Sequence, residues 1–320
     1  MKRRYVTTDV FTDRVFGGNP LAVVLDAEGL STAQMQSIAL EFNYSETTFV
    51  LPPDHATHTA KVRIFTPRVE VPFAGHPNVG TAFALARDAR FAAAAAGGSF
   101  VFEEQAGLVP LTLLQENGVT VGAELRAPEA LSRRTTLPRE VAAACLSLDP
   151  RDIAMHVHAP QIVSVGLPFL VVELVNRDAL SHSRPDMAAH AEHLPLNGAD
   201  AVFAYWRTPD QPGAHHETVL HARTFAPLDG VIEDPATGSA CGAAITLLAT
   251  LELAGAGAQP SPASSAVDSA GTLRGWRIHQ GVDMGRPSIL RGRTLARDGA
   301  VTETYIGGRC VPVLEGSFNL

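Results

Sequence analysis

One pattern occurs twice in this chain, at two widely separated places. Arg63 to Pro67 (RIFTP) and Arg223 to Pro227 (RTFAP) share the form R-x-F-x-P, and each is followed by an acidic residue, a glycine turn and a helical run. A repeat at so long a period indicates two related domains, because solenoid units recur every 20 to 50 residues or so. The pattern therefore predicts two similar halves, each built as strand, acidic turn, glycine turn and buried helix.

The second copy leads into the more apolar helix. Glu233-Asp234-Pro235 is followed by Thr237-Gly238-Ser239, and Ala240 to Leu253 is apolar nearly all round. Such a helix should be buried on every side. We expect Gly238 to adopt positive φ and Asp234 or Ser239 to cap the helix. Free N–H groups at its start would suit a carboxylate or phosphate.

The first copy leads into a helix predicted over residues 78–87. It opens with Phe73-Ala74-Gly75-His76-Pro77, in which Pro77 suits the first helical position and His76 is a candidate cap. If the two halves face each other, the two helix N-termini converge on one cleft. This convergence is an expectation about how the two halves are arranged in space.

Composition and charge narrow the class of protein. The 320 residues are enough for two domains, and a formal charge of −8 argues against a dedicated nucleic-acid binder. Residues 1–25 lack the pattern of a signal peptide, and no long apolar run is free of breaks, so we expect neither export nor a membrane span. Cys145, Cys241 and Cys310 show no paired spacing, which fits a reducing cytoplasm. The sequence thus predicts a soluble cytoplasmic protein.

Hydrophobic alternation and turn residues place the other elements. Ser31-x-x-Gln34 is a capping-box pattern that predicts a helix ending near Asn43, and Gly17-Gly18-Asn19-Pro20 predicts a tight turn between two strands. The shift to Pro, Arg, Ser and Thr over 127–138 marks the domain crossover. Further helices are expected over 138–146 and 184–193. Strands are expected over 6–11, 21–25, 47–51, 61–66, 100–102, 109–114, 119–125, 162–165, 169–175, 201–206, 219–225 and 276–280, with 301–306 and 310–314 as a last antiparallel pair.

Several types of site can be set aside. The sequence has no dinucleotide-binding G-x-G-x-x-G after a strand, no P-loop and no G-x-S-x-G elbow. His215 and His216 suggest a metal, but no third ligand follows at a recognisable spacing. Glu46 stands at the mouth of a strand, where an exposed structural glutamate is the common case.

Four long segments resemble one family. FGGNPLAVVLDAEGLSTAQMQSIALEFNYSETTFVLPP (16–53), RIFTPRVEVPFAGHPNVGTA (63–82), GVIEDPATGSACGAA (230–244) and QGVDMGRPS (280–288) are similar to segments of the PhzF-like isomerase/epimerase family of phenazine biosynthesis. They lie in the expected order and span most of the chain, apart from 88–160 and 254–275.

The resemblance implies an α+β fold of the diaminopimelate-epimerase type. In that fold two pseudo-symmetric domains each wrap a curved, mostly antiparallel sheet around a central helix, with the site between them. We expect the first domain over 1–127, completed by a C-terminal strand near 308–320, and the second over 128–307. The resemblance also implies a homodimer. No role is assigned to the 254–271 loop.

The resemblance further implies cofactor-independent proton transfer at carbon, without a metal. Glu46 of the SET segment matches the family's acid/base glutamate, and His76 and Asp234 match its other catalytic positions. A small carboxylate metabolite would be bound by Asn19, Gly75, Thr237, Gly238 and Ser239. Racemases of the diaminopimelate type carry a cysteine just before each glycine, where this chain has Ala74 and Thr237, so a two-thiol mechanism is not expected.

Three functions remain open at this point. The first is an isomerase or epimerase with Glu46 as general acid/base. The second is a non-catalytic protein that binds a small molecule in the same cleft, and the third is a hydrolase or lyase that uses it. Cys241, near a helix start where a thiol pKa can fall, is interpreted as apolar filler. Asn78 stands where related sequences often have threonine.

Overall fold

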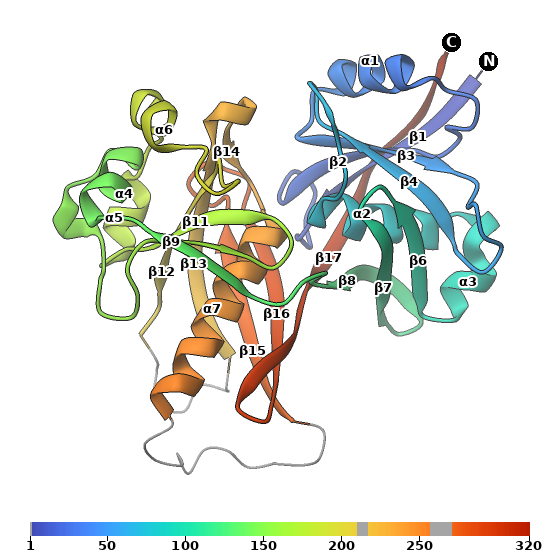
Figure 1. Ribbon diagram of the computed structural model, residues 1–320. Coiled ribbons are helices and arrows are strands. Elements are labelled where there is room, and N and C mark those ends of the chain that lie inside the picture. Colours follow the sequence, from blue (N-terminus) through green and yellow to red (C-terminus); the bar gives the residue numbers. More distant parts are fainter. Residues whose placement is uncertain (1, 210–216, 257–270) are drawn as a thin grey trace. The chain divides into compact units, whose positions relative to one another are not determined.

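The computed structural model describes residues 2–209, 217–256 and 271–320. It has the mixed α+β fold that the sequence predicts, and the chain divides into two compact units (Figure 1). Unit 1 contains 1–126, 285–289 and 307–320, and unit 2 contains 127–284 and 290–306. The segment 285–289 had been assigned to the second domain. It belongs to unit 1 because Ile289 N–H donates to the Phe11 carbonyl and Arg286 bonds to Asp9.

Unit 1 is a mostly antiparallel sheet. Strands β1 and β2, β3 and β4, β4 and β5, β6 and β7, and β7 and β8 pair antiparallel, whereas β2 with β3 and β4 with β6 pair parallel. The strands are β1 (Lys2–Val10), β2 (Asn19–Val24), β3 (Glu46–Leu51), β4 (Ala60–Phe65), β5 (Glu70–Val71), β6 (Ser99–Glu104), β7 (Gly107–Glu116) and β8 (Val119–Arg126).

Helix α2 (Gly75–Ala86) is the central helix of unit 1. All of its residues from Gly75 to Leu85 are buried, and it packs against β1, β2, β3, β7 and β8. Gly80 lets it approach the sheet, because a Cβ there would lie 2.6 Å from Leu21 Cδ2 and 2.7 Å from Val10 Cγ2. The strands therefore hold the start of α2 at a fixed place.

Helix α1 (Thr32–Phe42) has the predicted capping box. Ser31 Oγ accepts from Gln34 N–H, Gln34 Oε1 accepts from Ser31 N–H, and Asn43 ends the helix in the left-handed conformation. Met35, Ile38 and Ala39 form its buried face. The connection between α2 and β6 contains a short 3₁₀ turn (Ala89–Phe91) and α3 (Ala92–Ala96).

Unit 2 is a second mixed sheet with its own central helix. Pairs β9–β10, β10–β11, β12–β13 and β13–β14 are antiparallel, and β11–β12 and β13–β15 are parallel. Helices α4 (Arg139–Cys145), α5 (Arg177–His182) and α6 (Met187–His193) flank this sheet. The strands are β9 (Ser132–Thr136), β10 (Gln161–Ser164), β11 (Pro168–Glu173), β12 (Val202–Arg207), β13 (Glu217–Ala226), β14 (Val231–Asp234), β15 (Thr272–Gln280) and β16 (Ser288–Arg297), and 3₁₀ turns lie at Pro150–Asp152 and Pro227–Asp229. The helix predicted from 184 begins only at Met187, because Pro185 precedes Asp186, whose side chain caps α6.

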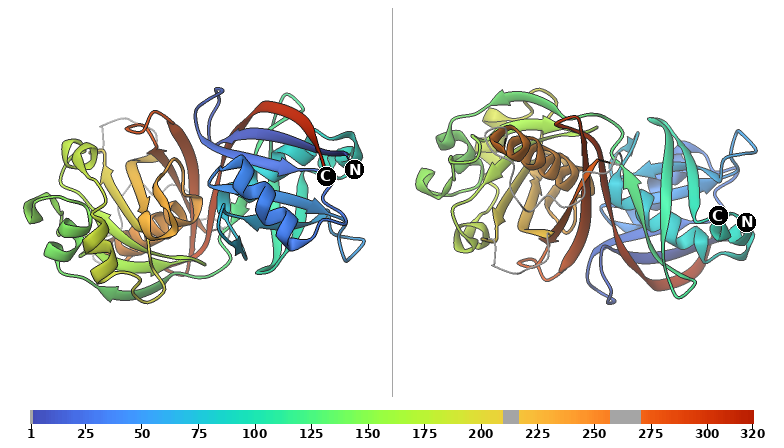
Figure 2. Two further views of the ribbon diagram at one scale, coloured as in Figure 1. Left: turned by 90° about the horizontal axis from the view of Figure 1, so that it is seen from above. Right: turned by 90° about the horizontal axis from the view of Figure 1, so that it is seen from below.

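Helix α7 (Gly238–Ala256) is the central helix of unit 2 and lies among its strands in both views of Figure 2. Of the predicted run Ala240 to Leu253, residues 240–249 are all buried and 250–253 are partly exposed. Residues 238–255 are long and apolar enough to cross a membrane by length and composition alone. Their burial against β10, β11 and β15 instead places them in a protein core.

The last two predicted strands are one strand, so that prediction was wrong. β17 runs unbroken over Ala300–Asn319, belongs to unit 2 up to Ile306, and pairs with β1 from Cys310 onward, which brings the N and C marks together in Figure 1. Gly307 and Gly308 lie inside this strand. They allow a close approach, since a Cβ on Gly307 would lie 2.6 Å from the Ala123 carbonyl oxygen.

Candidate functional site

A carboxylate and an imidazole meet at the start of α2 in unit 1. Oε2 of Glu46 lies 3.4 Å from Nε2 of His76, and their side chains are 19% and 5% exposed. Glu46 is the first residue of β3, as predicted, and His76 lies in the first turn of α2. Two of the predicted catalytic residues are therefore neighbours.

His76 does not cap its helix, contrary to the prediction. Helix α2 begins at Gly75 and its N-cap is Ala74, which has no side-chain oxygen to bond the first N–H groups. Pro77 has no N–H to satisfy. The N–H groups of Gly75 and His76 at this end consequently receive no side-chain cap, and the imidazole is available for Glu46.

Burial keeps the His76 imidazole neutral. Removal from water lowers its pKa to about 3, and a hydrogen bond with the Pro20 carbonyl opposes this only in part. The amide of Asn19 lies 3.3 Å from the other ring nitrogen, Nδ1. The ring thus has a polar neighbour at Nδ1 and carries no charge at neutral pH.

Asn19 is positioned by the turn that precedes β2. Gly18 adopts φ 62°, as a turn glycine can, and the parallel pairing of β2 with β3 brings Ser45 Oγ to 3.5 Å from Asn19 Oδ1. Arg286 donates to the carbonyl oxygens of Gly17 and Gly18 at 2.9 and 3.0 Å. The structure thus gives Arg286 a supporting role that the sequence analysis missed, although the segment QGVDMGRPS contains it.

The predicted residues of unit 2 gather at the start of α7. Thr237 precedes the helix and its hydroxyl donates to Asp234 Oδ2. Gly238 is the first helical residue and has no positive φ, and Ser239 lies inside the first turn, so neither serves as predicted in a turn or as a cap. Helix α7 begins at Gly238 itself, so Gly238 adopts helical backbone angles and no separate glycine turn precedes the helix.

Gln280 holds this group together and was not singled out from the sequence. Its amide nitrogen lies 2.8 Å from the Asp234 carbonyl and 3.1 Å from both Thr224 Oγ1 and Thr237 Oγ1, and its Oε1 accepts from Thr237 N–H at 3.1 Å. The side chain is fully buried. Its only sequence signal was its place at the head of the segment 280–288.

Cys241 is a buried packing residue, but it is not purely apolar filler, since its Sγ donates to Gln280 Oε1 at 3.7 Å. It is fully buried in α7, and burial raises the pKa of its thiol, so the fall that a helix start can cause does not occur. Ala74 and Thr237 stand before the two glycines, and neither can act as a thiol. Two-thiol chemistry at these positions is therefore excluded by residue identity.

Asn19, Glu46, Gly75 and His76 thus lie together in unit 1, and Asp234, Thr237, Gly238 and Ser239 lie together in unit 2. Over 2–209, 217–256 and 271–320, no three His, Cys, Asp or Glu side chains are grouped as a metal site would require. His215 and His216 and most of the 254–271 loop lie outside these ranges.

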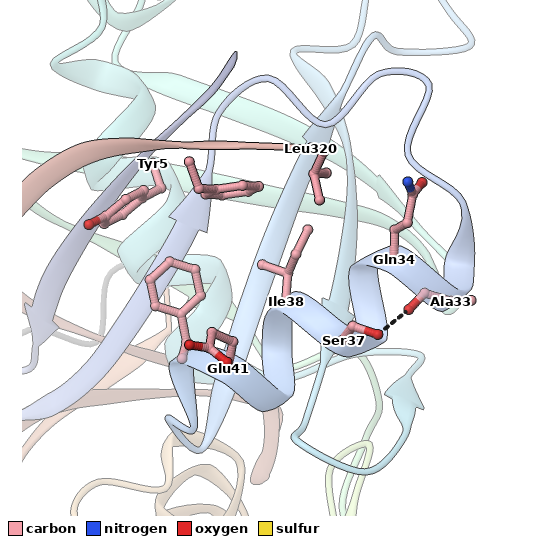
Figure 3. Close-up of a pocket in the computed structure, with 9 residues that line it drawn as sticks. Tyr5, Ala33, Gln34, Ser37, Ile38, Glu41 and Leu320 are labelled. Atoms are coloured by element: carbon pink, nitrogen blue, oxygen red, sulfur yellow. Dashed lines mark hydrogen bonds between the residues drawn. The ribbon is translucent and has the colours of Figure 1, made fainter. Parts of the chain in front are cut away.

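A pocket of about 510 Å³ lies elsewhere on unit 1, beside α1 (Figure 3). Tyr5, Ile38 and Leu320 give it an apolar wall, and Gln34 and Ser37 contribute polar groups at one end. None of the predicted site residues lines it. It is therefore separate from the group around Glu46.

Comparison with known proteins gives a consistent result. Residues 8–316 match the family model described as phenazine biosynthesis-like protein. An uncharacterized isomerase of Mesorhizobium japonicum is 38% identical, with 98% of each chain covered. The trans-2,3-dihydro-3-hydroxyanthranilate isomerase of Pseudomonas chlororaphis is 34% identical, with 99% of each covered. The crystal structure of a Bacillus anthracis phenazine biosynthesis protein of the PhzF family has the same fold, with a TM-score of 0.79 at 22% identity over the whole of both chains.

Proposed function

Because this chain belongs to the phenazine biosynthesis-like protein family and is an isomerase like its relatives, we propose that Glu46 is its general acid and base. In this proposal Glu46 removes a proton from a carbon of a small carboxylate metabolite and returns one to another carbon, or to the opposite face of the same carbon. The step needs no cofactor, since the carboxylate can both accept and donate the proton.

The observation that carries the proposal is the contact between Glu46 and the neutral His76. The low pKa of His76 means that the imidazole does not take a proton from Glu46 near pH 7. Glu46 Oε2 lies 3.4 Å from His76 Nε2, so the carboxyl group borders an uncharged imidazole. In this proposal the carboxyl group, and not the imidazole, changes protonation during turnover.

We assign carboxylate-binding N–H groups to the start of α2 in unit 1 and, separately, to the start of α7 in unit 2. A helix start carries a partial positive charge and unsatisfied donors, which suit a carboxylate and the enolate-like charge that develops next to it. Support comes from the N–H groups of Gly75 and His76 in unit 1, which receive no side-chain cap. Gly238 and Ser239 hold the corresponding first positions of α7 in unit 2. Asp234 would orient the substrate, with Thr237 and Gln280 holding Asp234.

The test uses Glu46→Gln and trans-2,3-dihydro-3-hydroxyanthranilate, the compound named for the Pseudomonas relatives, in D₂O. We expect wild-type enzyme to form an isomer that carries deuterium, and Glu46→Gln to be slower by about 10²–10⁴-fold, the usual contribution of a general acid/base. Glu41→Gln, on the exposed side of α1, is the matched control and should keep full activity.

Three outcomes would contradict the proposal. Near-wild-type turnover by Glu46→Gln would remove this residue from the role. Binding of the compound without isotope exchange would favour a binding protein, and loss of a leaving group would favour a hydrolase or lyase. A panel of other small carboxylates, screened by the same exchange measurement, then separates a wrong substrate from a wrong mechanism.

A further inference from the structure

A buried ion pair in unit 1 lies behind the turn that leads to Asn19. Asp9, near the end of β1, is buried, and its Oδ1 lies 2.6 Å from Nη2 of Arg286. The pair joins the first strand of the chain to a residue 277 positions later, in the stretch 285–289 that belongs to unit 1. The reaction proposed above uses neither of these two side chains.

Arg286 also holds the backbone of the turn. Its guanidinium donates to the carbonyl oxygens of Gly17 and Gly18, at 2.9 Å from Nη2 and 3.0 Å from Nε. The next residue takes part as well, since the Gly18 N–H donates to the Pro287 carbonyl at 3.0 Å. One guanidinium thus bonds to two carbonyl oxygens and to the Asp9 carboxylate. The rigid fork of an arginine suits such an arrangement, and the compact ammonium of a lysine does not reproduce it.

The second carboxylate oxygen of Asp9 fixes the same turn one residue earlier. Asp9 Oδ2 accepts from the Phe16 N–H at 2.6 Å. Phe16 has φ 66°, a conformation that a bulky residue keeps only when its surroundings hold it there. Its ring is 69% exposed, so packing of the side chain supplies little of that restraint. The carboxylate supplies it instead, through the backbone.

The turn is connected directly to the group around the proposed acid/base. Asn19 follows Gly18 in the chain and is the first residue of β2, and its amide nitrogen lies 3.3 Å from Nδ1 of His76. Asn19 is fully buried, so its side chain has little room to move independently of its backbone. A displacement of the turn should therefore move the Asn19 amide, and with it the polar neighbour of the imidazole.

We propose that Arg286, paired with Asp9, is a positioning residue that acts through the turn at 17–18. By holding this turn it keeps the Asn19 amide beside the His76 imidazole, which borders the proposed acid/base. The effect on catalysis rests on the proposed function, whereas the effect on the imidazole does not. A loosened turn should act mainly on kcat, because a misplacement of about 1 Å near the reacting groups can cost about 10²-fold in rate.

The first measurement needs no substrate. Arg286→Lys keeps the charge of the ion pair, so the protein should stay folded, but the lysine cannot bond to all three acceptors. The imidazole ¹⁵N resonances of His76, assigned by their absence from His76→Gln, should shift in Arg286→Lys and in Asn19→Ala. They should not shift in the control Arg177→Lys, whose arginine donates to both carboxylate oxygens of Asp283 at 2.8 and 2.9 Å. Wild-type His76 resonances in Arg286→Lys would overturn the proposal.

The second measurement separates positioning from a general loss of stability. With trans-2,3-dihydro-3-hydroxyanthranilate as substrate, kcat of Arg286→Lys should fall by about ten- to hundredfold while KM changes less. Because Arg286 acts through Asn19, the same substitution should lower kcat little further in an Asn19→Ala background. Arg177→Lys should keep the wild-type kcat. Additive losses from Arg286→Lys and Asn19→Ala would contradict the role and leave Arg286 a purely structural residue.

A second variant tests the other half of the ion pair. Asp9→Asn removes the charge opposite Arg286 but keeps a side-chain oxygen for the Phe16 N–H. It should shift the same His76 resonances and show the same lack of additivity with Asn19→Ala, and wild-type behaviour in both respects would also contradict the proposal. If no turnover is seen with any of these proteins, the proposed function fails, while the ¹⁵N resonances still decide whether the ion pair positions the imidazole.

Discussion

Arg223 donates two hydrogen bonds to Glu233, at 2.8 Å from Nε to Oε1 and 2.7 Å from Nη2 to Oε2. Arg63 makes the same pair with Glu70 in unit 1, with both distances 2.7 Å. Each guanidinium also lies over the ring of the phenylalanine two residues on, at 4.9 and 5.1 Å from the centroid. The repeated sequence pattern therefore corresponds to a repeated interaction, in which an arginine on a strand forms a bidentate ion pair with the glutamate that follows it.

Replacing Arg223 should destabilise the protein far more than replacing Arg63. Arg223 is almost fully buried and also donates to the carbonyl oxygens of Leu180, Ser181 and Ser183. Arg223→Met leaves these carbonyl oxygens and the Glu233 carboxylate without their partner, which should lower the free energy of unfolding by about 3–5 kcal/mol. Arg63→Met, at a more exposed pair, should cost about 1 kcal/mol. Urea unfolding of both variants checks the difference, and equal losses would contradict it.

The neutral His76 should make the protein sensitive to acid. Its folded pKa of about 3 lies below the ordinary value of 6.5, so the unfolded chain binds a proton between these values while the folded chain does not. Stability from this group is therefore full above pH 6.5 and is lost as the pH falls toward 3. His76→Gln should flatten this part of the pH dependence of Tm. An unchanged slope between pH 6.5 and 4 would show that His76 titrates normally.

Glu104→Gln should stabilise the protein at alkaline pH. The folded pKa of about 8 lies above the ordinary 4.5, so wild type loses stability as the pH rises between these values and the glutamine variant does not. The two proteins should have similar Tm near pH 4.5, and the variant should gain up to a few kcal/mol by pH 8. Thermal unfolding at both pH values is the measurement, and a gain that is equal at both would refute the titration.

Gln280 should matter for the start of α7 even though it does not lie in the helix. Gln280→Ala leaves Thr237 N–H and the buried hydroxyl of Thr224 without their partner. We expect a loss of about 1–3 kcal/mol for these unsatisfied groups. Faster amide hydrogen exchange at residues 237–241, compared with residues 75–78 in the same sample, locates the effect. A uniform change across both helices would not fit this explanation.

Gly307→Ala should be costly, because the glycine allows close backbone contact. The new Cβ would lie 2.6 Å from the Ala123 carbonyl oxygen and 2.7 Å from the Glu124 Cα, and neither is a flexible side-chain end. Overpacking of this kind costs roughly 1–3 kcal/mol. Gly255→Ala, where nothing lies within 4 Å in the last turns of α7, is the control and should stabilise by about 0.5–1 kcal/mol. Equal Tm for the two variants would count against close packing at 307.

The sequence supported predictions wherever a pattern had a local cause. The capping box at Ser31, the turn at Gly18 and the buried run after Ser239 each follow from neighbouring residues, and the structure contains all three. Glu46 and His76 were identified as candidate site residues by resemblance to the family. The structure places Glu46 Oε2 3.4 Å from His76 Nε2. Their catalytic roles remain proposals.

Other features depend on contacts between distant segments, and these were missed. Two glycines at 307–308 are compatible with a turn or with a crowded strand, and only Ala123 and Phe11 decide between them. In the sequence Gln280 is an ordinary strand residue. Its role follows only from its hydrogen bonds to the Asp234 carbonyl and to Thr237 Oγ1, which the fold brings close. Glu104 looks like a surface carboxylate, and its environment is created by α2.

Strand β17 bears on how the protein is made. Residues 310–319 are synthesised long after residues 2–10, with which they pair. During synthesis β1 must therefore keep one edge without its partner strand until β17 has been made. The sheet of unit 1 can close only then, whereas the strands of unit 2 up to residue 306 are made slightly earlier.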